Sequence, residues 1–171
     1  MVAKGYTQKY GIDYKDTFAP VTKINTIRVL ISLAANLNWT LRQFYVKNAF
    51  LNGIIDEVYM DPPPGTKCTN RVCKLKKVLY GLKQSPRAWF GRLSTYMRKL
   101  GYKQSDADHT LFIKQKLEKV SALIVYVDDM VVTVNDPSEI TALQRKLAAE
   151  FELKDLGNLK YFLGIEVARS A

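Results

Sequence analysis

Hydrophobic positions along this chain repeat with a helical period in three segments. Residues 22–37 place apolar side chains at every third or fourth position, which predicts a helix with Thr22 as a possible N-cap. A second helix is predicted over 86–100, because Pro86 suits the first turn of a helix. The same period over 137–151 predicts a third helix, which Asp136 can cap.

Strand-like segments alternate with these helices. Residues 41–46 are rich in aromatic and branched side chains, and residues 160–167 are mostly apolar. Residues 121–134 form a nearly continuous apolar run with a predicted turn at Asp128–Asp129, which indicates a hairpin.

The order of these elements predicts an α+β fold. With residues 52–84 set aside as an insertion, the order is strand, helix, hairpin, helix, strand, which is the ferredoxin-like β-α-β-β-α-β pattern. In such a sheet the first strand lies beside the third. We therefore expect residues near position 45 to lie close to Asp128 and Asp129.

Asp128 and Asp129 interrupt the most hydrophobic hairpin of the predicted sheet. Two neighbouring carboxylates repel each other, and burying each of them unpaired costs several kcal/mol. Hard cations such as Mg²⁺ remove that cost because they bind oxygen ligands, and two such ions about 4 Å apart can promote nucleotidyl transfer. A lone Asp-Asp pair is common in hairpin turns, so the pair becomes informative only beside other features.

The basic charge of the chain is concentrated in one block. Residues 67–103 contain eleven of the 26 Lys and Arg residues and none of the 16 Asp and Glu residues. Such a field attracts polyanions, of which nucleic acid is the usual one, whereas the alternative is a solvated lysine-rich face. The charge pattern therefore favours a nucleic-acid partner.

Other features limit the classes of function. The chain has no run of 18 uncharged apolar residues to span a membrane and no apolar signal-peptide core. We therefore expect an intracellular protein, cytoplasmic or nuclear, that is not secreted and does not bind a membrane. Cys68 and Cys73 could form half of a zinc site, but His109 is the single histidine and two ordinary thiols are favoured.

Six sequence blocks cover nearly the whole chain: VAKGYTQ, GIDYKDTFAPV, VKNAFLNG, VCKLKKVLYGLKQSPRAW, YVDDM and KDLGNLKYFLGIEVARS. In this order and spacing they resemble the reverse transcriptase of copia-type (Pseudoviridae-like) LTR retrotransposons. The resemblance implies an RNA-directed DNA polymerase that uses two Mg²⁺ ions, dNTPs and an RNA or DNA template-primer. It also implies one partial domain, 1–171, made of a polymerase palm (41–51 and 85–167) and fingers-side segments (1–40 and 52–84), with the thumb absent.

The resemblance implies roles for individual residues. Asp128 and Asp129 match the catalytic aspartates that hold the metal ions. Phe50 matches the aromatic residue that lies beneath the deoxyribose and excludes a 2′-hydroxyl, although a core phenylalanine is the alternative. The residues expected to support the template and the incoming nucleotide are Gly81, Gln84, Ser85 and Pro86. The residues expected to contact nucleic acid are Tyr126 and Val127 beside the primer end, Leu163 and Gly164 in a primer grip, and Lys74, Lys76, Lys77, Lys83 and Arg87 on phosphates.

Tyr45 departs from the family pattern, in which the corresponding segment reads Asp-Val-Lys-Asn-Ala-Phe. In the family that aspartate is the third carboxylate of the metal site. Tyrosine is neutral near pH 7 and cannot supply a bidentate carboxylate, whereas positioning and charge neutralisation provide most of this catalysis. We therefore expect impaired catalysis, and the truncated fingers and thumb expected here would add to the impairment. The alternatives are a non-catalytic nucleic-acid-binding remnant and a non-functional product of a degenerate element.

Overall fold

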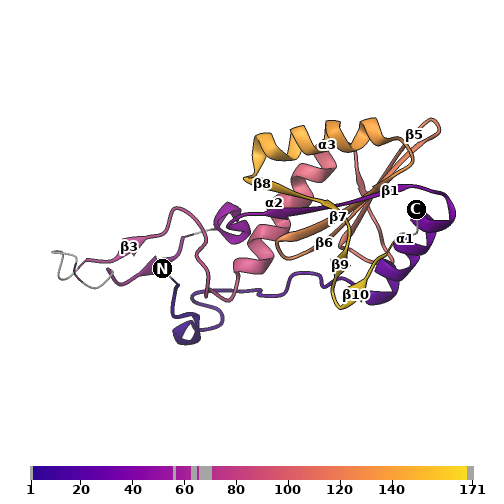
Figure 1. Cartoon of the computed structure of the whole chain (residues 1–171). Coiled ribbons are helices and arrows are strands. Elements are labelled where there is room, and N and C mark those ends of the chain that lie inside the picture. The colour runs from indigo at the N-terminus through magenta and orange to yellow at the C-terminus, as the bar shows by residue number, and fades with distance from the viewer. Residues whose placement is uncertain (1, 56, 63–64, 66–70, 169–171) are drawn as a thin grey trace. The chain divides into compact units, whose positions relative to one another are not determined.

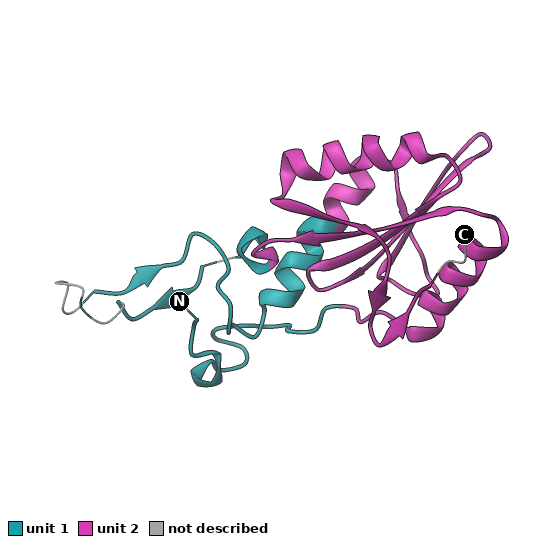
Figure 2. Cartoon of the chain, viewed as in Figure 1, with its two compact units in different colours: residues 1–19, 50–93 teal, residues 20–49, 94–171 magenta. Residues whose placement is uncertain are grey.

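The computed structural model describes residues 2–55, 57–62, 65 and 71–168, and the chain divides into two compact units (Figures 1 and 2). Unit 1 contains residues 1–19 and 50–93, and unit 2 contains residues 20–49 and 94–171. The predicted assignment of segments to fingers and palm stays a prediction. None of the helices in the described part of the chain is both long enough and apolar enough to cross a membrane.

A six-stranded antiparallel sheet forms the centre of unit 2, with the strand order β4-β5-β6-β7-β1-β8. Its strands are β1 (Thr40–Val46), β4 (Lys103–Gln104), β5 (Leu111–Lys116), β6 (Lys119–Tyr126), β7 (Asp129–Val134) and β8 (Leu153–Asn158). The fold is therefore mixed α and β. The predicted pairing of the first strand with the second strand of the hairpin is confirmed by the β1–β7 ladder.

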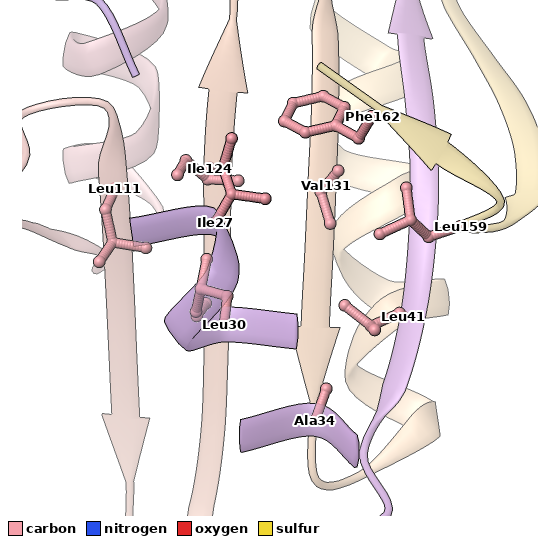
Figure 3. Packing of buried hydrophobic residues seen from close by; sticks show 10 residues of the cluster. Ile27, Leu30, Ala34, Leu41, Leu111, Ile124, Val131, Leu159 and Phe162 are labelled. Carbon is pink, nitrogen blue, oxygen red and sulfur yellow. The ribbon is translucent and has the colours of Figure 1, made fainter. Parts of the chain in front are cut away.

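Helix α1 (Ile24–Asn36) covers one face of this sheet through an apolar cluster. Figure 3 shows side chains from α1 meeting side chains from the strands and from the C-terminal segment. The cluster consists of Ile27, Leu30, Ala34, Leu41, Leu111, Ala122, Ile124, Val131, Leu159 and Phe162. Because side chains alternate along a strand, the buried Met130 and Val132 point to the opposite face, where α3 (Pro137–Glu150) lies (Figure 1).

Helix α2 (Ser85–Lys99) begins in unit 1 and ends in unit 2. Within unit 2, the Tyr96 ring meets Phe151 edge-on at 5.4 Å between centroids, and its hydroxyl donates to the Lys146 carbonyl at 2.7 Å. The end of α2 is therefore anchored to α3 and to Phe151, the residue directly after α3.

The N-termini of α1 and α3 are capped in different ways. Asp136 caps α3 as predicted, since its carboxylate accepts a hydrogen bond from the Ser138 amide at 2.9 Å. Thr22 does not cap α1, because its hydroxyl donates to the Val125 carbonyl on β6 at 2.6 Å. Asp108, remote in sequence, instead accepts from the Lys23 amide at 2.9 Å, so α1 is capped by another segment.

The predicted strand over 160–167 is wrong. The strand that pairs with β1 is β8, and residues 161–166 form a separate small hairpin of β9 (Tyr161–Phe162) and β10 (Ile165–Glu166). Leu163 and Gly164 connect these strands with φ values of 48° and 81°, which a two-residue hairpin loop requires. The sequence of β8 lacks the pattern of a strand, because its apolar residues Leu153 and Leu156 do not alternate with polar ones.

Unit 1 has little regular structure besides the first half of α2. It contains the 3-10 turn Gly5–Thr7, most of the turn Ala49–Asn52, and a ribbon of β2 (Tyr59–Met60) and β3 (Cys73–Lys74). Of the basic segment 71–81, only Cys73 and Lys74 belong to a strand. Hydrogen bonds between the N-terminal residues and residues 80–85 hold this unit together.

Candidate functional site

Val127 and Asp128 form the two-residue loop between β6 and β7, one position earlier than the predicted turn. Val127 has a φ of 55°, a left-handed conformation that is unfavourable for a branched side chain. The Val46 amide donates to the Asp128 carbonyl at 2.8 Å, which fixes this loop to the end of β1. Tyr126 and Val127 are 37% and 42% exposed, so the predicted nucleic-acid-contacting side chains are accessible in this structure.

Asp129 lies in a row of directly opposed residues on three strands. It pairs with Tyr45 on β1 and with Tyr126 on β6. Directly opposed residues project to the same face of a sheet with Cβ atoms about 5 Å apart. The predicted proximity of position 45 to the aspartate pair is therefore confirmed.

The environment of Asp129 disfavours its charged form. Burial raises the pKa of Asp129, and the neighbouring Asp128 carboxylate raises it further, whereas a hydrogen bond from the Gln43 side chain lowers it in part. Gln43 lies two residues before Tyr45 on β1, on the same face of the sheet. No sequence motif marks Gln43, because its contact with Asp129 depends on the register of β1 and β7.

The side chains around this row do not fit a site with three carboxylates for two divalent ions. Among the described residues, no group of three His, Cys, Asp or Glu side chains comes together. Tyr45 occupies the place opposite Asp129 from which a third carboxylate would reach the pair. Cys73 is a free, exposed cysteine, and Cys68 lies outside the described residues, so the zinc alternative stays untested.

In unit 1, the residues predicted to support a nucleotide form part of a joint with the N-terminal segment. Gln84 accepts from Gln8 Nε2 at 3.0 Å and donates through its own amide to the Asp13 carbonyl at 3.2 Å. Gly81 lies so close to the N-terminal backbone that a Cβ on it would be 2.1 Å from the Ala3 carbonyl oxygen. Gln84 and Gly81 are therefore structural elements of this joint, whatever else they contact.

Ser85 and Pro86 begin helix α2. The Ser85 side chain is buried, and its hydroxyl donates to the Leu79 carbonyl at 2.6 Å. Ser85 thus fixes the turn that precedes α2.

Phe50 is half-buried, and its ring is 4.8 Å from that of Tyr80. This contact satisfies the expectation of a packed phenylalanine and leaves part of the ring accessible. Both interpretations of Phe50, a packing role and a nucleotide contact, therefore stand.

The five basic residues predicted to contact phosphates differ in their surroundings. Lys74 forms an ion pair with Glu57, and Arg87 lies 3.2 Å from the Asp16 carboxylate. Lys76 and Lys77 are exposed and form no ion pair in the described part of the chain. Lys83 stands over the ring of Tyr14, with Nζ 4.9 Å from the centroid. Two of the five charges are thus partly neutralised.

Leu163 and Gly164 form the tip of the β9–β10 hairpin in unit 2. Leu163 is partly buried against the apolar cluster under α1, whereas Gly164 is exposed. Packing therefore accounts for Leu163, and a primer-grip role for either residue stays a prediction.

Structure and sequence together define a protein of mixed α and β structure with an aspartate pair at a hairpin tip. Asp129 of this pair lies opposite Tyr45 on the neighbouring strand. The family model for reverse transcriptase (RNA-dependent DNA polymerase) matches residues 1–171. The chain belongs to this family.

Curated relatives agree with this assignment. The chain is 45% identical over 173 residues to the retrovirus-related Pol polyprotein from transposon RE1 of Arabidopsis thaliana, a match that covers 99% of the chain and 12% of that polyprotein. It is 39% identical to the Pol polyprotein from transposon TNT 1-94 of Nicotiana tabacum, over 99% of the chain and 13% of that polyprotein. The predicted resemblance to copia-type retrotransposons is therefore confirmed.

Other comparisons show how much of a relative the chain covers. It is 31% identical over 130 residues to a putative transposon Ty5-1 protein of Saccharomyces cerevisiae, which covers 74% of the chain and 42% of that protein. No solved structure matches the chain. The chain thus spans about an eighth of the length of the Pol polyproteins that it matches most fully.

Proposed function

We propose that this chain is a reverse transcriptase segment that binds an RNA or DNA template-primer and dNTP, and that its nucleotidyl transfer is impaired. The observation that carries the impairment is the register of β1 and β7, in which Tyr45 lies opposite Asp129. Family membership supports the polymerase ancestry, and the central sheet with its aspartate pair supports assigning unit 2 largely to a palm. The N-terminal and basic segments of unit 1 would then be fingers-side elements.

The chemical reason for the impairment is a missing charge. Two-ion nucleotidyl transfer depends on carboxylates that position Mg²⁺ ions and on the charge neutralisation that these ions supply. The site offers the Asp128 and Asp129 carboxylates, a neutral Tyr45, and an environment that raises the pKa of Asp129. These groups would bind divalent cations more weakly than three carboxylates do.

Primer extension on an RNA template, with Mg²⁺ or Mn²⁺, tests this proposal. We expect no more dNTP incorporation by the chain than by its Asp128→Ala variant. Incorporation that disappears in Asp128→Ala would contradict the impairment. Fluorescence anisotropy with the same template-primer, on the same samples, shows that the absence of incorporation does not reflect absence of binding.

A second candidate is nucleic-acid binding without catalysis, and the charge of unit 1 favours it. Residues 1–19 and 50–93 contain eleven Lys and Arg residues against five Asp and Glu residues. Cations alone suffice for phosphate contacts, which carry little base specificity. We expect sequence-independent binding that weakens steeply with salt, because bound cations release condensed counterions. Absence of binding at about 50 mM salt, the low end of the range in which such contacts are strong, would exclude this candidate.

A further inference from the structure

Tyr10 and Tyr14 form an aromatic pair on a compact loop of unit 1. Their ring centroids are 5.9 Å apart with an interplanar angle of 68°, and Tyr10 is 76% exposed. The Gly11 amide donates to the Tyr14 carbonyl at 2.9 Å, and the Asp13 amide donates to the Lys9 carbonyl at 2.9 Å. The loop therefore holds a tyrosine ring open to solvent on a backbone that is already ordered.

A fixed cation lies beside this pair. Lys83 Nζ is 4.9 Å from the Tyr14 ring centroid and 3.2 Å from its hydroxyl oxygen. The Lys83 backbone is held as well, because its amide donates to Gln8 Oε1 at 2.8 Å. In the described part of the chain no carboxylate forms an ion pair with Lys83, so its charge stays available to an external anion.

Both carboxylates of this loop are already engaged, because Asp13 accepts a backbone hydrogen bond and Asp16 lies 3.2 Å from Arg87. The Asp13 carboxylate accepts the Lys9 amide at 2.7 Å and thereby closes the loop. Lys9 and Lys15, which flank the loop, are both exposed. An aromatic face, an adjacent fixed cation and flanking lysines are the combination that binds single-stranded nucleic acid, in which bases stack on rings and phosphates meet cations.

We propose that Tyr10, Tyr14 and Lys83 form a stacking site for unpaired bases of single-stranded nucleic acid. This inference rests on the proposed function and makes it more specific, because it assigns the single-stranded part of a template to this loop. A blunt duplex keeps its base faces inside the stack, so it could use the cations of the loop but not the tyrosine rings. The site should therefore bind single-stranded nucleic acid better than a duplex and accept any base sequence.

Fluorescence anisotropy with a 12-nucleotide RNA and with a blunt duplex of the same sequence tests the site. Tyr10→Ala should weaken binding of the single strand about tenfold, in line with the loss of one base–aromatic stack, and should change duplex binding less than twofold. Tyr10→Phe, which keeps the ring, should retain the affinity. Tyr6→Ala is the matched control, because Tyr6 is a 77% exposed tyrosine outside this loop and its loss should leave both affinities unchanged.

Two further measurements separate stacking from charge. Lys83→Gln should reduce the slope of log affinity against log salt by about 1, whereas Tyr10→Ala should leave the slope unchanged. Ultraviolet crosslinking of the wild-type chain to the single strand should yield an adduct on Tyr10 or Tyr14, identified by mass spectrometry. The crosslink provides a readout that does not depend on the folding of any variant.

The possible outcomes distinguish failure of the stacking site from failure of nucleic-acid binding as a whole. Unchanged single-strand affinity in Tyr10→Ala, an equal loss for single strand and duplex, or crosslinks only outside the loop would overturn the stacking site while nucleic-acid binding stands. If the wild-type chain binds neither the single strand nor the duplex at low salt, both the proposed function and the stacking site are wrong. A loop that instead contacts protein would show the first of these patterns.

Discussion

Tyr45 on β1 lies directly opposite Asp129 on β7, and Asp129 lies in turn opposite Tyr126 on β6. A carboxylate thus stands between two tyrosines at the end of the central strands. Its pKa is raised by burial and by Asp128, and a hydrogen bond from Gln43 offsets this only in part. Among the described residues no third His, Cys, Asp or Glu side chain joins Asp128 and Asp129 in this row.

Replacement of Tyr45 by aspartate should make unit 2 dependent on divalent cations. In chelated buffer at pH 7, repulsion with Asp129 and Asp128 should lower the free energy of unfolding by about 1–2 kcal/mol, since directly opposed like charges are destabilising. Mg²⁺ or Mn²⁺ should raise the Tm of Tyr45→Asp more than that of the wild type. Thermal unfolding followed by circular dichroism measures both effects.

The control for this substitution is Tyr161→Asp, which introduces the same charge at an exposed tyrosine on β9. Its Tm should not respond to divalent cations. A Tyr45→Asp variant whose Tm is also insensitive to them would contradict the geometry inferred from the β1–β7 register.

Substitution of Asp108 by asparagine should destabilise unit 2 in a pH-dependent way. Burial alone would raise the pKa of Asp108, but hydrogen bonds from Thr110, from the Lys23 amide and from Thr26 outweigh it and lower the pKa. A lowered folded-state pKa stabilises the protein above the unfolded-state value of about 3.9, and this contribution disappears as pH falls through the folded-state pKa. At pH 7 we expect a loss of about 1.5–3 kcal/mol for a charged hydrogen-bonding group.

Urea unfolding at a series of pH values checks this prediction. The difference between wild type and Asp108→Asn should be constant near neutrality and shrink below about pH 4, where the unfolded-state carboxylate begins to protonate. Asp106→Asn is the matched control, because Asp106 is exposed and lies two positions away. A pH-independent difference would show that Asp108 acts through shape and not through charge.

Glycine at position 117 should stabilise the chain. Leu117 is 89% exposed and has a φ of 55° in the two-residue loop between β5 and β6. A left-handed conformation costs an L-residue about 1–2 kcal/mol, which glycine avoids at a smaller entropic cost. Leu117→Gly should therefore raise the free energy of unfolding by about 0.5–1 kcal/mol, measured by urea denaturation.

Leu163 provides the contrasting case for this prediction. It has a φ of 48°, but it packs against the cluster under α1. Leu163→Gly relieves the same backbone strain and loses apolar contacts, so it should not stabilise the chain. Equal gains from the two substitutions would contradict the packing role of Leu163.

Alanine at position 81 should loosen the joint in unit 1. Gly81 has a φ of 93°, and a Cβ there would be 2.1 Å from the Ala3 carbonyl oxygen, so the N-terminal segment must move away. Gly11→Ala is the control, because Gly11 also has a positive φ, 81°, but has open space around it. Gly81→Ala should cost clearly more than the approximately 1–2 kcal/mol of backbone strain expected for Gly11→Ala.

Hydrogen exchange measured by mass spectrometry localises the effect of these glycine substitutions. In Gly81→Ala the amides of Ala3 and Lys83, which donate to Tyr80 and Gln8, should exchange faster than in the wild type. In Gly11→Ala they should keep wild-type protection. Equal exchange in both variants would show that the close approach at Gly81 does not hold the N-terminal segment.

Local patterns predicted much of unit 2. The helical periods gave all three helices within a few residues, and the apolar run at 121–134 gave the β6–β7 hairpin. The pairing of β1 with β7 followed from the order of elements, since connections in such folds have few alternatives. The strand at 153–158 was missed because Leu153 and Leu156 do not alternate with polar residues and Gly157 is unfavourable inside a strand.

The sequence by itself determined the family, the aspartate pair, the basic block and the substitution at Tyr45, because these properties depend on residue identity and order. Only the tertiary structure decided that Asp108 caps α1, that Gln43 donates to Asp129, and that Gln8 and Gln84 tie the N-terminal segment to α2. These contacts join residues far apart in the chain. Hydrogen bonds and charges act over a few ångströms in space, and sequence separation does not reveal which groups folding brings within that distance.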